Sequence, residues 1–327
     1  MAHIKSADLE VRRATPDDDG EVIPLLQAAL KKDDDPHYRA FLDWKHRQNP
    51  FGVSPAWVAL HEGRIVGYRT LLRWRFINDE GKKVTAVRAV DTATHPDFQG
   101  LGIFRLLTVR GVAELTMEGD GIVFNTPNDQ SRPGYLKMGW SEVKRLPIGV
   151  LPSGPKAMVK MVSSRVPAAL WSEDTNVGLA GSELADSNLA SALLAHAPKR
   201  GFRTDRTPEY LAWRTALEPL RYRVLLADER DPAEGGVIFR LKRRGTTVEA
   251  AIVEQLVPNA RVGARLVWDV VNRTKADYAI GLRTGPSAGL IPMPVPGMGP
   301  LLTTRPLAAS PPPPGAWTLT LADVELF

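Results

Sequence analysis

The chain has 327 residues, enough for two domains or one large one, and its 43% hydrophobic and 24% charged residues are typical of a folded globular protein. It contains no cysteine, which excludes disulfide frameworks, thiolate zinc sites and a cysteine nucleophile. The formal net charge of +5 is modest, so we expect most lysines and arginines to solvate the surface rather than to bind nucleic acid.

The N-terminal segment, MAHIKSADLEVRRATPDDD, has no apolar stretch that would serve as a signal peptide. No later apolar run reaches the roughly 20 residues that a membrane-spanning helix needs. Together with the lack of cysteine, these features favour a cytoplasmic protein that does not enter a membrane.

The first predicted elements are a strand at Leu9–Ala14 and a helix. Thr15 is a suitable N-cap, Pro16 suits the first helical position, and apolar residues then recur at helical spacing. After a second helical stretch, two apolar runs joined by a turn predict strands at Ala56–Gly63 and Arg64–Ile77.

A further predicted strand, Val84–Thr94, leads through a glycine-containing loop into a helix at Gly102–Glu118. A short apolar run, Gly121–Thr126, predicts a buried strand. The first half therefore reads as a sheet interleaved with helices.

The second half repeats the order of features found in the first. FLDWKHRQNP (Phe41–Pro50) has a counterpart in YLAWRTALEP (Tyr210–Pro219), and each block follows an amphipathic segment and precedes a pair of predicted strands. A third strand, Thr247–Pro258, leads to a segment with one glycine, Gly263, where the first half has two. We therefore predict an internal duplication whose second copy has lost the glycine loop.

The glycine loop of the first half, HPDFQGLGIF, stands between a predicted strand and a predicted helix. Glycine lets the backbone turn sharply and approach a ligand, and the free amides at a helix start favour an anion. A dinucleotide-binding fingerprint would need a third glycine at position 105, where the chain has arginine, and the G-K-[ST] of a P-loop is absent. The loop thus predicts either an anion site or a tight turn without a ligand.

Two motifs resemble those of the GNAT superfamily of N-acyltransferases. Gln99 and Gly102 occupy positions of the acyl-CoA-binding pattern [QR]-x-x-G-x-[GA], and Phe104 replaces its final small residue. NDQSRPGYLKMGW (Asn128–Trp140) resembles the family's N-x-x-[AS]-x-x-x-Y-x-K-x-G-[FW] element. The resemblance covers Leu9–Val143, and the weak repeat extends it to the second half.

This resemblance implies an α/β fold of two GNAT-like modules, each a central, mostly antiparallel twisted sheet flanked by helices (an α+β mixed sheet). It implies an acyl-CoA-binding catalytic domain at 1–150, a linker at 151–180 and a degenerate GNAT-like domain at 181–327. The second domain would wall the acceptor cleft or form the surface of a homodimer.

The resemblance also implies acetyl-CoA, or another acyl-CoA, as the cosubstrate. Its pyrophosphate would meet the loop amides, its pantetheine arm would pair with the preceding strand, and Asn128 would order that arm or cap the next turn. The expected cofactor-binding residues are Thr92, Ala93, Thr94, Gln99, Gly100, Leu101, Gly102, Ile103, Phe104 and Asn128.

Tyr135 matches the family's usual general acid, which protonates the departing thiolate; a packing tyrosine is the alternative. Asp91 lies near the strand end, where it would either accept the amine's proton or pair with an arginine such as Arg88. Asn125 either contacts the substrate or shapes the turn. The six histidines are scattered without ligand spacing, so we expect no metal.

These features predict an acetyl-CoA-dependent N-acetyltransferase. It would transfer an acyl group to the primary amine of a small molecule (an amino sugar, an amino acid or another amine) or of a peptide, by direct attack in a ternary complex. A non-catalytic acyl-CoA-binding or scaffold protein is the alternative, favoured by Phe104. RNA-linked aminoacyl transfer is a weaker alternative, because the arginines are dispersed.

Overall fold

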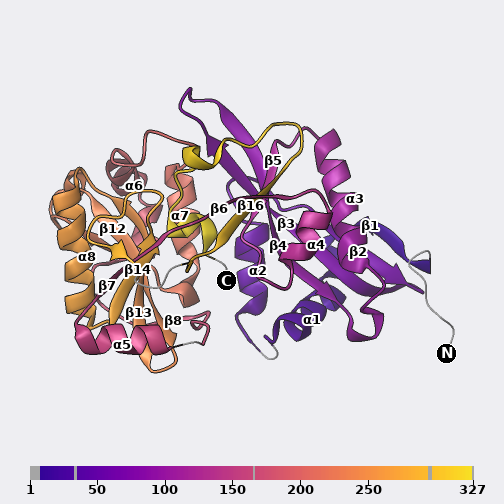
Figure 1. The fold of residues 1–327 in the computed structure, drawn as a ribbon, viewed down its shortest axis with the longest axis horizontal. Helices are drawn as coiled ribbons and strands as arrows, with labels where there is room; N and C mark the ends of the chain where they lie inside the picture. Colours follow the sequence, from indigo (N-terminus) through magenta and orange to yellow (C-terminus); the bar gives the residue numbers. More distant parts are fainter. Residues whose placement is uncertain (1–7, 33–34, 165, 294–296, 326–327) are drawn as a thin grey trace. The chain divides into compact units, whose positions relative to one another are not determined.

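A computed structural model describes residues 8–32, 35–164, 166–293 and 297–325, which form two compact units (Figure 1). The first unit contains the chain up to Phe76, Lys83–Val143 and Leu302–Pro311. The second contains Ile77–Lys82, Lys144–Leu301 and the chain from Pro312 onward. Within these ranges, no helix has both the length and the apolar character needed to span a membrane.

The first unit is built on one mixed sheet. Its helices and strands are β1 (Glu10–Arg13), α1 (Asp19–Leu30), α2 (Tyr38–His46), β2 (Ala56–His61), β3 (Arg64–Ile77), β4 (Lys83–Thr94), α3 (Ile103–Met117), β5 (Ile122–Asn125), α4 (Arg132–Lys137), β6 (Ser141–Arg145) and β16 (Leu301–Pro306). The strand order is β1-β2-β3-β4-β5-β16-β6. Strands β4 and β5 are parallel, whereas β1–β2, β2–β3 and β5–β16 are antiparallel.

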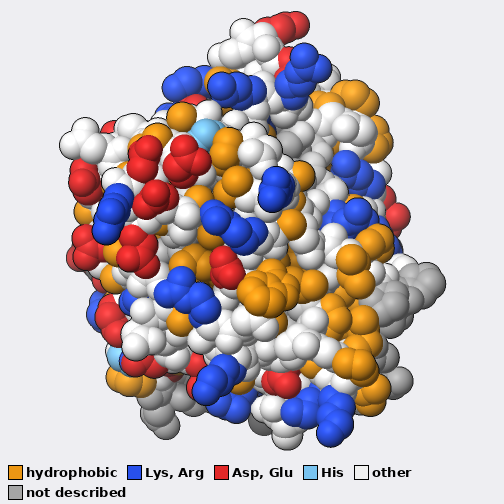
Figure 2. Space-filling model, turned by 90° about the vertical axis from the view of Figure 1, so that its left-hand side faces the viewer, with side chains coloured by type: hydrophobic (Ala, Val, Ile, Leu, Met, Phe, Trp, Pro, Cys, Tyr) orange, Lys and Arg blue, Asp and Glu red, His pale blue; other side chains and the backbone are white. Residues whose placement is uncertain are grey.

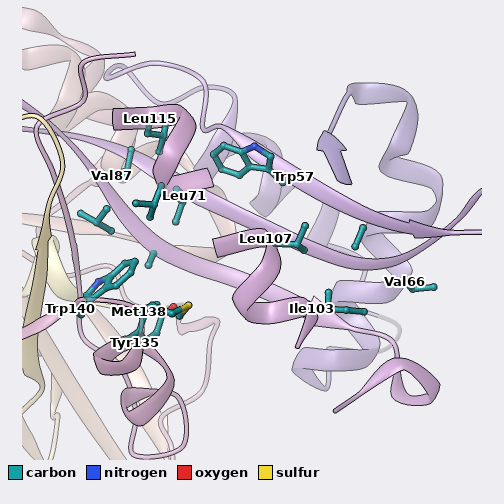
Figure 3. Close-up of a cluster of buried hydrophobic side chains, with 14 residues drawn as sticks. Trp57, Val66, Leu71, Val87, Ile103, Leu107, Leu115, Tyr135, Met138 and Trp140 are labelled. Atoms are coloured by element: carbon teal, nitrogen blue, oxygen red, sulfur yellow. The ribbon is translucent and has the colours of Figure 1, made fainter. Parts of the chain in front are cut away.

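One face of this sheet is covered by α3 and α4. Buried residues of α3 recur at steps of one, three and four positions, so they form one stripe along the helix. In Figure 3, Leu107 and Leu115 of α3 lie in one cluster with Leu71 of β3 and Val87 of β4, and Tyr135, Met138 and Trp140 lie together at the side of α4. Every strand from β2 to β5 contributes to this cluster, so it holds both helices to the sheet.

Helices α1 and α2 cover the opposite face. Neighbouring residues in a strand point to opposite faces, so Tyr68 of β3 points away from the side that carries its neighbour Arg69. Tyr68 lines a pocket together with Val22 of α1 and Leu42 of α2. The two helix pairs therefore approach β3 and β4 from opposite sides.

The second unit has the same kind of sheet. Its helices and strands are β7 (Ile148–Pro152), α5 (Pro155–Ser163), β8 (Ser172–Glu173), β9 (Leu179–Ala180), α6 (Ser187–Leu194), β10 (Arg203–Thr204), α7 (Pro208–Ala216), β11 (Arg223–Leu226), β12 (Gly236–Arg244), β13 (Thr247–Leu256), α8 (Ala260–Thr274), β14 (Tyr278–Leu282), β15 (Ile291–Pro292) and α9 (Leu321–Val324). The strand order is β15-β7-β14-β13-β12-β11-β9, with β8 beside β12. Again one pair, β13–β14, is parallel and is joined by a long helix, α8.

These two units confirm the predicted α/β class with two modules, each built on a mostly antiparallel sheet. The sequence did not reveal which strands from distant parts of the chain join each sheet. Strand β16, from near the C-terminus, pairs with β5 of the first sheet, while β7, from the middle of the chain, pairs with β14 of the second. The domain ranges 1–150, 151–180 and 181–327 describe the sequence repeat and stay a prediction.

Charged groups of both signs are exposed on the second unit. On the side shown in Figure 2, basic side chains are scattered among acidic and hydrophobic ones, and acidic side chains gather in one part of the view. A surface of this kind differs from the continuous basic stripe that marks most nucleic-acid-binding faces.

The contact between β3 and the start of α3 depends on Gly67. A Cβ atom at this position would overlap Cγ2 of Ile103, a β-branched side chain that is 2% exposed. We expect Gly67→Ala to lower the free energy of unfolding by about 1–3 kcal/mol, the usual cost of overpacking a core. Urea unfolding followed by circular dichroism would measure it.

Gly20→Ala is the matched control, because Gly20 lies in α1 and a Cβ there meets no atom within 4 Å. Its unfolding midpoint should stay the same or rise, since alanine favours helix. Equal midpoints for the two variants would show that the β3–α3 contact is looser than described.

Candidate active site

Strand β4 continues well beyond its pairing with the short strand β5. Their pairing covers Ala86–Arg88 of β4 and Ile122–Phe124 of β5, yet β4 continues to Thr94. On its other edge β4 stays bound to β3, since the His95 amide donates to the Val66 carbonyl (2.9 Å). Alternate residues of an antiparallel strand face opposite edges, so the amide of Thr94 faces away from β3. The end of β4 therefore offers backbone groups on its open edge.

The predicted glycine loop adopts the geometry that an anion site requires. Gly100 and Gly102 have φ of +81° and +75°, the left-handed region that favours glycine, and a Cβ on either would point into open space. Gly102 is the N-cap of α3, and its carbonyl accepts the Leu106 amide at 2.9 Å. The amides before Leu106 have no acceptor inside the helix, and the helix dipole makes this end positive.

A pocket of about 840 Å³ opens beside this loop. It is lined by four of the predicted cofactor-binding residues, namely Thr92, Ala93, Thr94 and Gln99, and by the side of α1 that includes Glu21 and Leu25. Two basic side chains, Arg64 and His95, also line it, 3.4 Å apart. Its volume lies in the range of small-molecule and cofactor sites.

The other predicted cofactor-binding residues do not line this pocket. The side chains of Leu101 and Ile103 pack in the cluster under α3, and Ile103 is 2% exposed. Asn128 is exposed, and its Oδ1 accepts both the amide and the hydroxyl of Ser131 at 2.9 Å, so it caps the turn into α4. Any contact of Asn128 with a cofactor stays a prediction.

Tyr135 lies on α4 and is 4% exposed. Its ring meets Trp140 with centroids 5.1 Å apart, and its hydroxyl accepts a hydrogen bond of 2.8 Å from Nη2 of Arg69. A hydroxyl that accepts from a cation keeps its own proton to donate. Both readings of Tyr135 from the sequence, packing residue and proton donor, are compatible with this geometry.

Phe104, the departure from the family pattern, is directed at Tyr135. The two rings meet edge to face at 5.3 Å and 83°. Gly134 provides the room, because a Cβ there would lie 3.3 Å from the Phe104 ring. The ring thus fills space between α3 and α4.

Asp91 belongs to a polar cluster on the α2 side of the sheet. Its Oδ2 lies 2.7 Å from Nζ of Lys45 and 2.8 Å from Nε2 of His46, and its φ of +33° is unusual for an aspartate in a strand. Burial raises the pKa of Asp91, but Lys45 and His46 outweigh it and hold that pKa well below its usual range. Asp91 is therefore an ionised partner rather than a strong base by itself.

His46 and Tyr38 complete the cluster. Burial lowers the pKa of His46 more than Asp91 raises it, so the imidazole is neutral. With the proton on Nε2, directed at Asp91, Nδ1 carries a lone pair, and this buried atom has no hydrogen-bond partner among the described residues. The Tyr38 hydroxyl is also buried and has no hydrogen-bond partner among the described residues. Burial and the nearby Asp91 both raise the pKa of Tyr38.

Asn125 ends β5 and is 3% exposed. Its Oδ1 accepts from the Thr303 hydroxyl of β16 at 2.6 Å. The amide therefore fastens the end of β5 to its neighbour, and contact with a substrate stays a prediction.

Sequence reasoning missed Arg69, Lys45 and His46. The last two lie in the repeated tryptophan block, so the repeat pointed to their segment, but their role depends on Asp91, about forty-five residues away. Arg69 has no local signature, since it is one of several arginines in the β3 strand.

Residues 10–143 match the family model of the acetyltransferase (GNAT) domain. Among curated proteins, no match to the chain was found.

Solved structures resemble the whole chain. A probable N-acyltransferase from Enterococcus faecalis has a TM-score of 0.63 and 13% identity, over 92% of this chain and 73% of that chain. A GCN5-related N-acetyltransferase from Anabaena variabilis has a TM-score of 0.63 and 13% identity, over 91% and 73%. Another from Kribbella flavida has 0.60 and 13%, over 92% and 71%.

At these identities the likeness establishes the fold. Residues 10–143 of this chain match the acetyltransferase (GNAT) domain, and the two-unit chain has the fold of these solved N-acyltransferases.

Proposed function

We propose that this protein is an acetyl-CoA-dependent N-acetyltransferase that acts on the primary amine of a small molecule or a peptide. The observation that carries the proposal is the left-handed turn at Gly100 and Gly102, which opens α3 beside the free edge of β4. A buried tyrosine on the next helix, α4, supplies a proton donor.

In this proposal the coenzyme's diphosphate binds the amides from Gln99 to Phe104, at the positive end of α3. The pantetheine arm lies along Thr92–Thr94, where β4 has parted from β5. Arg64 and His95, in the adjoining pocket, suit an anionic ligand.

The reaction needs a neutral amine, a stabilised oxyanion and a protonated leaving group. The amine nitrogen attacks the thioester carbonyl carbon, and a β4 amide donates to the oxyanion. When the C–S bond breaks, its electron pair goes to sulfur, which takes the proton of the Tyr135 hydroxyl. The products are an amide and free coenzyme A.

We propose that Asp91 acts on the amine's proton through His46. Asp91 holds the Nε2 proton of His46, and the unpartnered Nδ1 accepts a proton from the amine. The imidazolium that forms is then stabilised by the adjacent carboxylate. His46 also lines an open pocket of about 320 Å³, through which the proton reaches solvent.

Thiol release from acetyl-CoA, measured across amino sugars, amino acids, small amines and peptides, tests this function. Turnover with one acceptor class supports it. Tight acyl-CoA binding without turnover for any of them would select the non-catalytic alternative instead.

Gly102→Ala should weaken coenzyme A binding at least about tenfold, because the new methyl group would occupy the open space before α3 and strain the turn. Calorimetry with coenzyme A measures the affinity. The control is Gly81→Ala, since Gly81 has almost the same φ, +76°, and equally open surroundings in the β3–β4 turn. Equal losses of coenzyme A affinity in the two variants would contradict the proposed diphosphate-binding site at this turn.

Tyr135→Phe should lower kcat by about 10²–10³-fold through loss of the proton donor, while coenzyme affinity stays nearly unchanged. Tyr278→Phe is the control, because it removes another buried hydroxyl, one that donates to Glu249 at 2.8 Å. Steady-state kinetics and calorimetry on both variants provide the comparison. A Tyr135→Phe enzyme with full kcat would rule out Tyr135 as the acid.

Asp91→Asn should lower the free energy of unfolding at pH 7 by about 3–5 kcal/mol, because Lys45 would keep its buried charge but lose the carboxylate that lies 2.7 Å from its Nζ. The folded-state pKa of Asp91 is depressed, so its carboxylate stabilises the fold above its unfolded pKa of about 4, and this contribution is lost as the pH falls towards the folded value.

Urea unfolding from pH 7 to pH 3 measures this dependence. The wild-type protein should lose more stability over this range than Asp91→Asn does. Parallel curves of unfolding free energy against pH for the two proteins would show that the Lys45–Asp91 pair contributes nothing to the pH dependence of stability.

A further inference from the structure

Among the residues that the structure describes, no carboxylate pairs with the buried cation of Arg69. It lies on β3, is 1% exposed, and belongs to no ion pair with a carboxylate among the described residues. Its one hydrogen bond there is the 2.8 Å bond from Nη2 to the Tyr135 hydroxyl, and its Nε has no acceptor. Burying a charge costs free energy unless the charge is paired, so this arrangement needs an explanation.

Buried arginines of the second unit are arranged differently. Arg206 lies 2.8 Å from Glu254 and 2.9 Å from Asp323, and Arg240 lies 3.0 Å from Glu325. These guanidinium groups lie against carboxyl side chains of the protein itself. Arg69 faces a neutral hydroxyl, which becomes negative only if it gives up its proton.

Aromatic rings enclose the Arg69 guanidinium. Its carbon Cζ lies 5.4 Å from the centre of the Phe104 ring and 5.5 Å from that of Tyr135. Ring faces attract a cation, and they also keep water away from it. The small residue that the family pattern expects at position 104 would leave this side of Arg69 uncovered. Phe104 and Arg69 therefore form one arrangement around Tyr135.

We propose that Arg69 is a positioning residue that orients the Tyr135 hydroxyl and stabilises the phenolate formed when Tyr135 protonates the coenzyme A thiolate. The inference rests on the proposed acyl transfer. In that step the O–H bond of Tyr135 breaks, the proton joins sulfur, and the electron pair stays on the phenol oxygen, 2.8 Å from the guanidinium. A water-borne proton, equivalent to the one released by the amine, restores the hydroxyl.

Arg69→Met, which keeps length and apolar packing but removes the charge, should lower kcat about 10- to 100-fold, the usual effect of losing a charge-assisted hydrogen bond. The alkaline limb of the kcat–pH profile should move to higher pH, because a phenol without its cation keeps its proton longer. Arg69→Lys should restore part of kcat, and Arg110→Met, on the exposed side of α3, should change neither quantity.

The double variant Arg69→Met/Tyr135→Phe separates this role from simple packing. If Arg69 acts through the phenol, the double variant is no slower than Tyr135→Phe alone. A further 10-fold or larger loss in the double variant, or an unmoved alkaline limb in Arg69→Met, would overturn the proposal.

A readout without turnover keeps this test distinct from that of the proposed function. The phenolate absorbance of Tyr135, taken as the pH-dependent signal lost in Tyr135→Phe, should appear at higher pH in Arg69→Met than in the wild-type protein. This comparison holds even if no amine is acetylated. An identical titration of the Tyr135 signal in both proteins would overturn the role of Arg69.

Discussion

The separation of β4 from β5 beyond Arg88 is the constraint on which the rest of the site depends. A strand that has lost a neighbour must find other partners for its backbone groups or leave them to a ligand. The unpaired end of β4 lies beside the positive end of α3. The turn into α3 needs two residues with left-handed backbone angles, Gly100 and Gly102. Hydrogen-bonding capacity and positive potential therefore meet at one place, which suits an extended coenzyme with an anionic diphosphate.

The groups proposed to transfer protons lie on two opposite faces of the sheet. On the α3 and α4 face, Tyr135 and Arg69 form a buried pair enclosed by aromatic rings. On the α1 and α2 face, Asp91 joins β4 to Lys45 and His46. Arg69 lies on β3 and Asp91 on β4, so the donor and the acceptor of the proposed reaction lie on opposite faces of the sheet. Such an arrangement fits a reaction that must take one proton from an amine and give one to a thiolate.

Features that depend on short-range chemistry were predictable from the sequence. The strands at Ala56–Gly63 and Arg64–Ile77 followed from apolar runs, and the turn of Gly100 and Gly102 followed from the special φ that glycine permits. What the sequence could not give depends on distant partners. The place of β16 beside β5 joins Thr303 to Asn125, 178 residues apart, and no local pattern records that pairing. The carboxylate partners of buried cations are equally non-local. That no described residue supplies one to Arg69 became visible only in three dimensions.

The most direct measurement of the central claim is backbone hydrogen–deuterium exchange with and without coenzyme A. If main-chain groups of the β4 end and the α3 turn hold the coenzyme, exchange slows at residues 92–94 and 99–104 when it is added. Unchanged exchange in both segments at saturating coenzyme A, or protection confined to the second unit, would contradict this account.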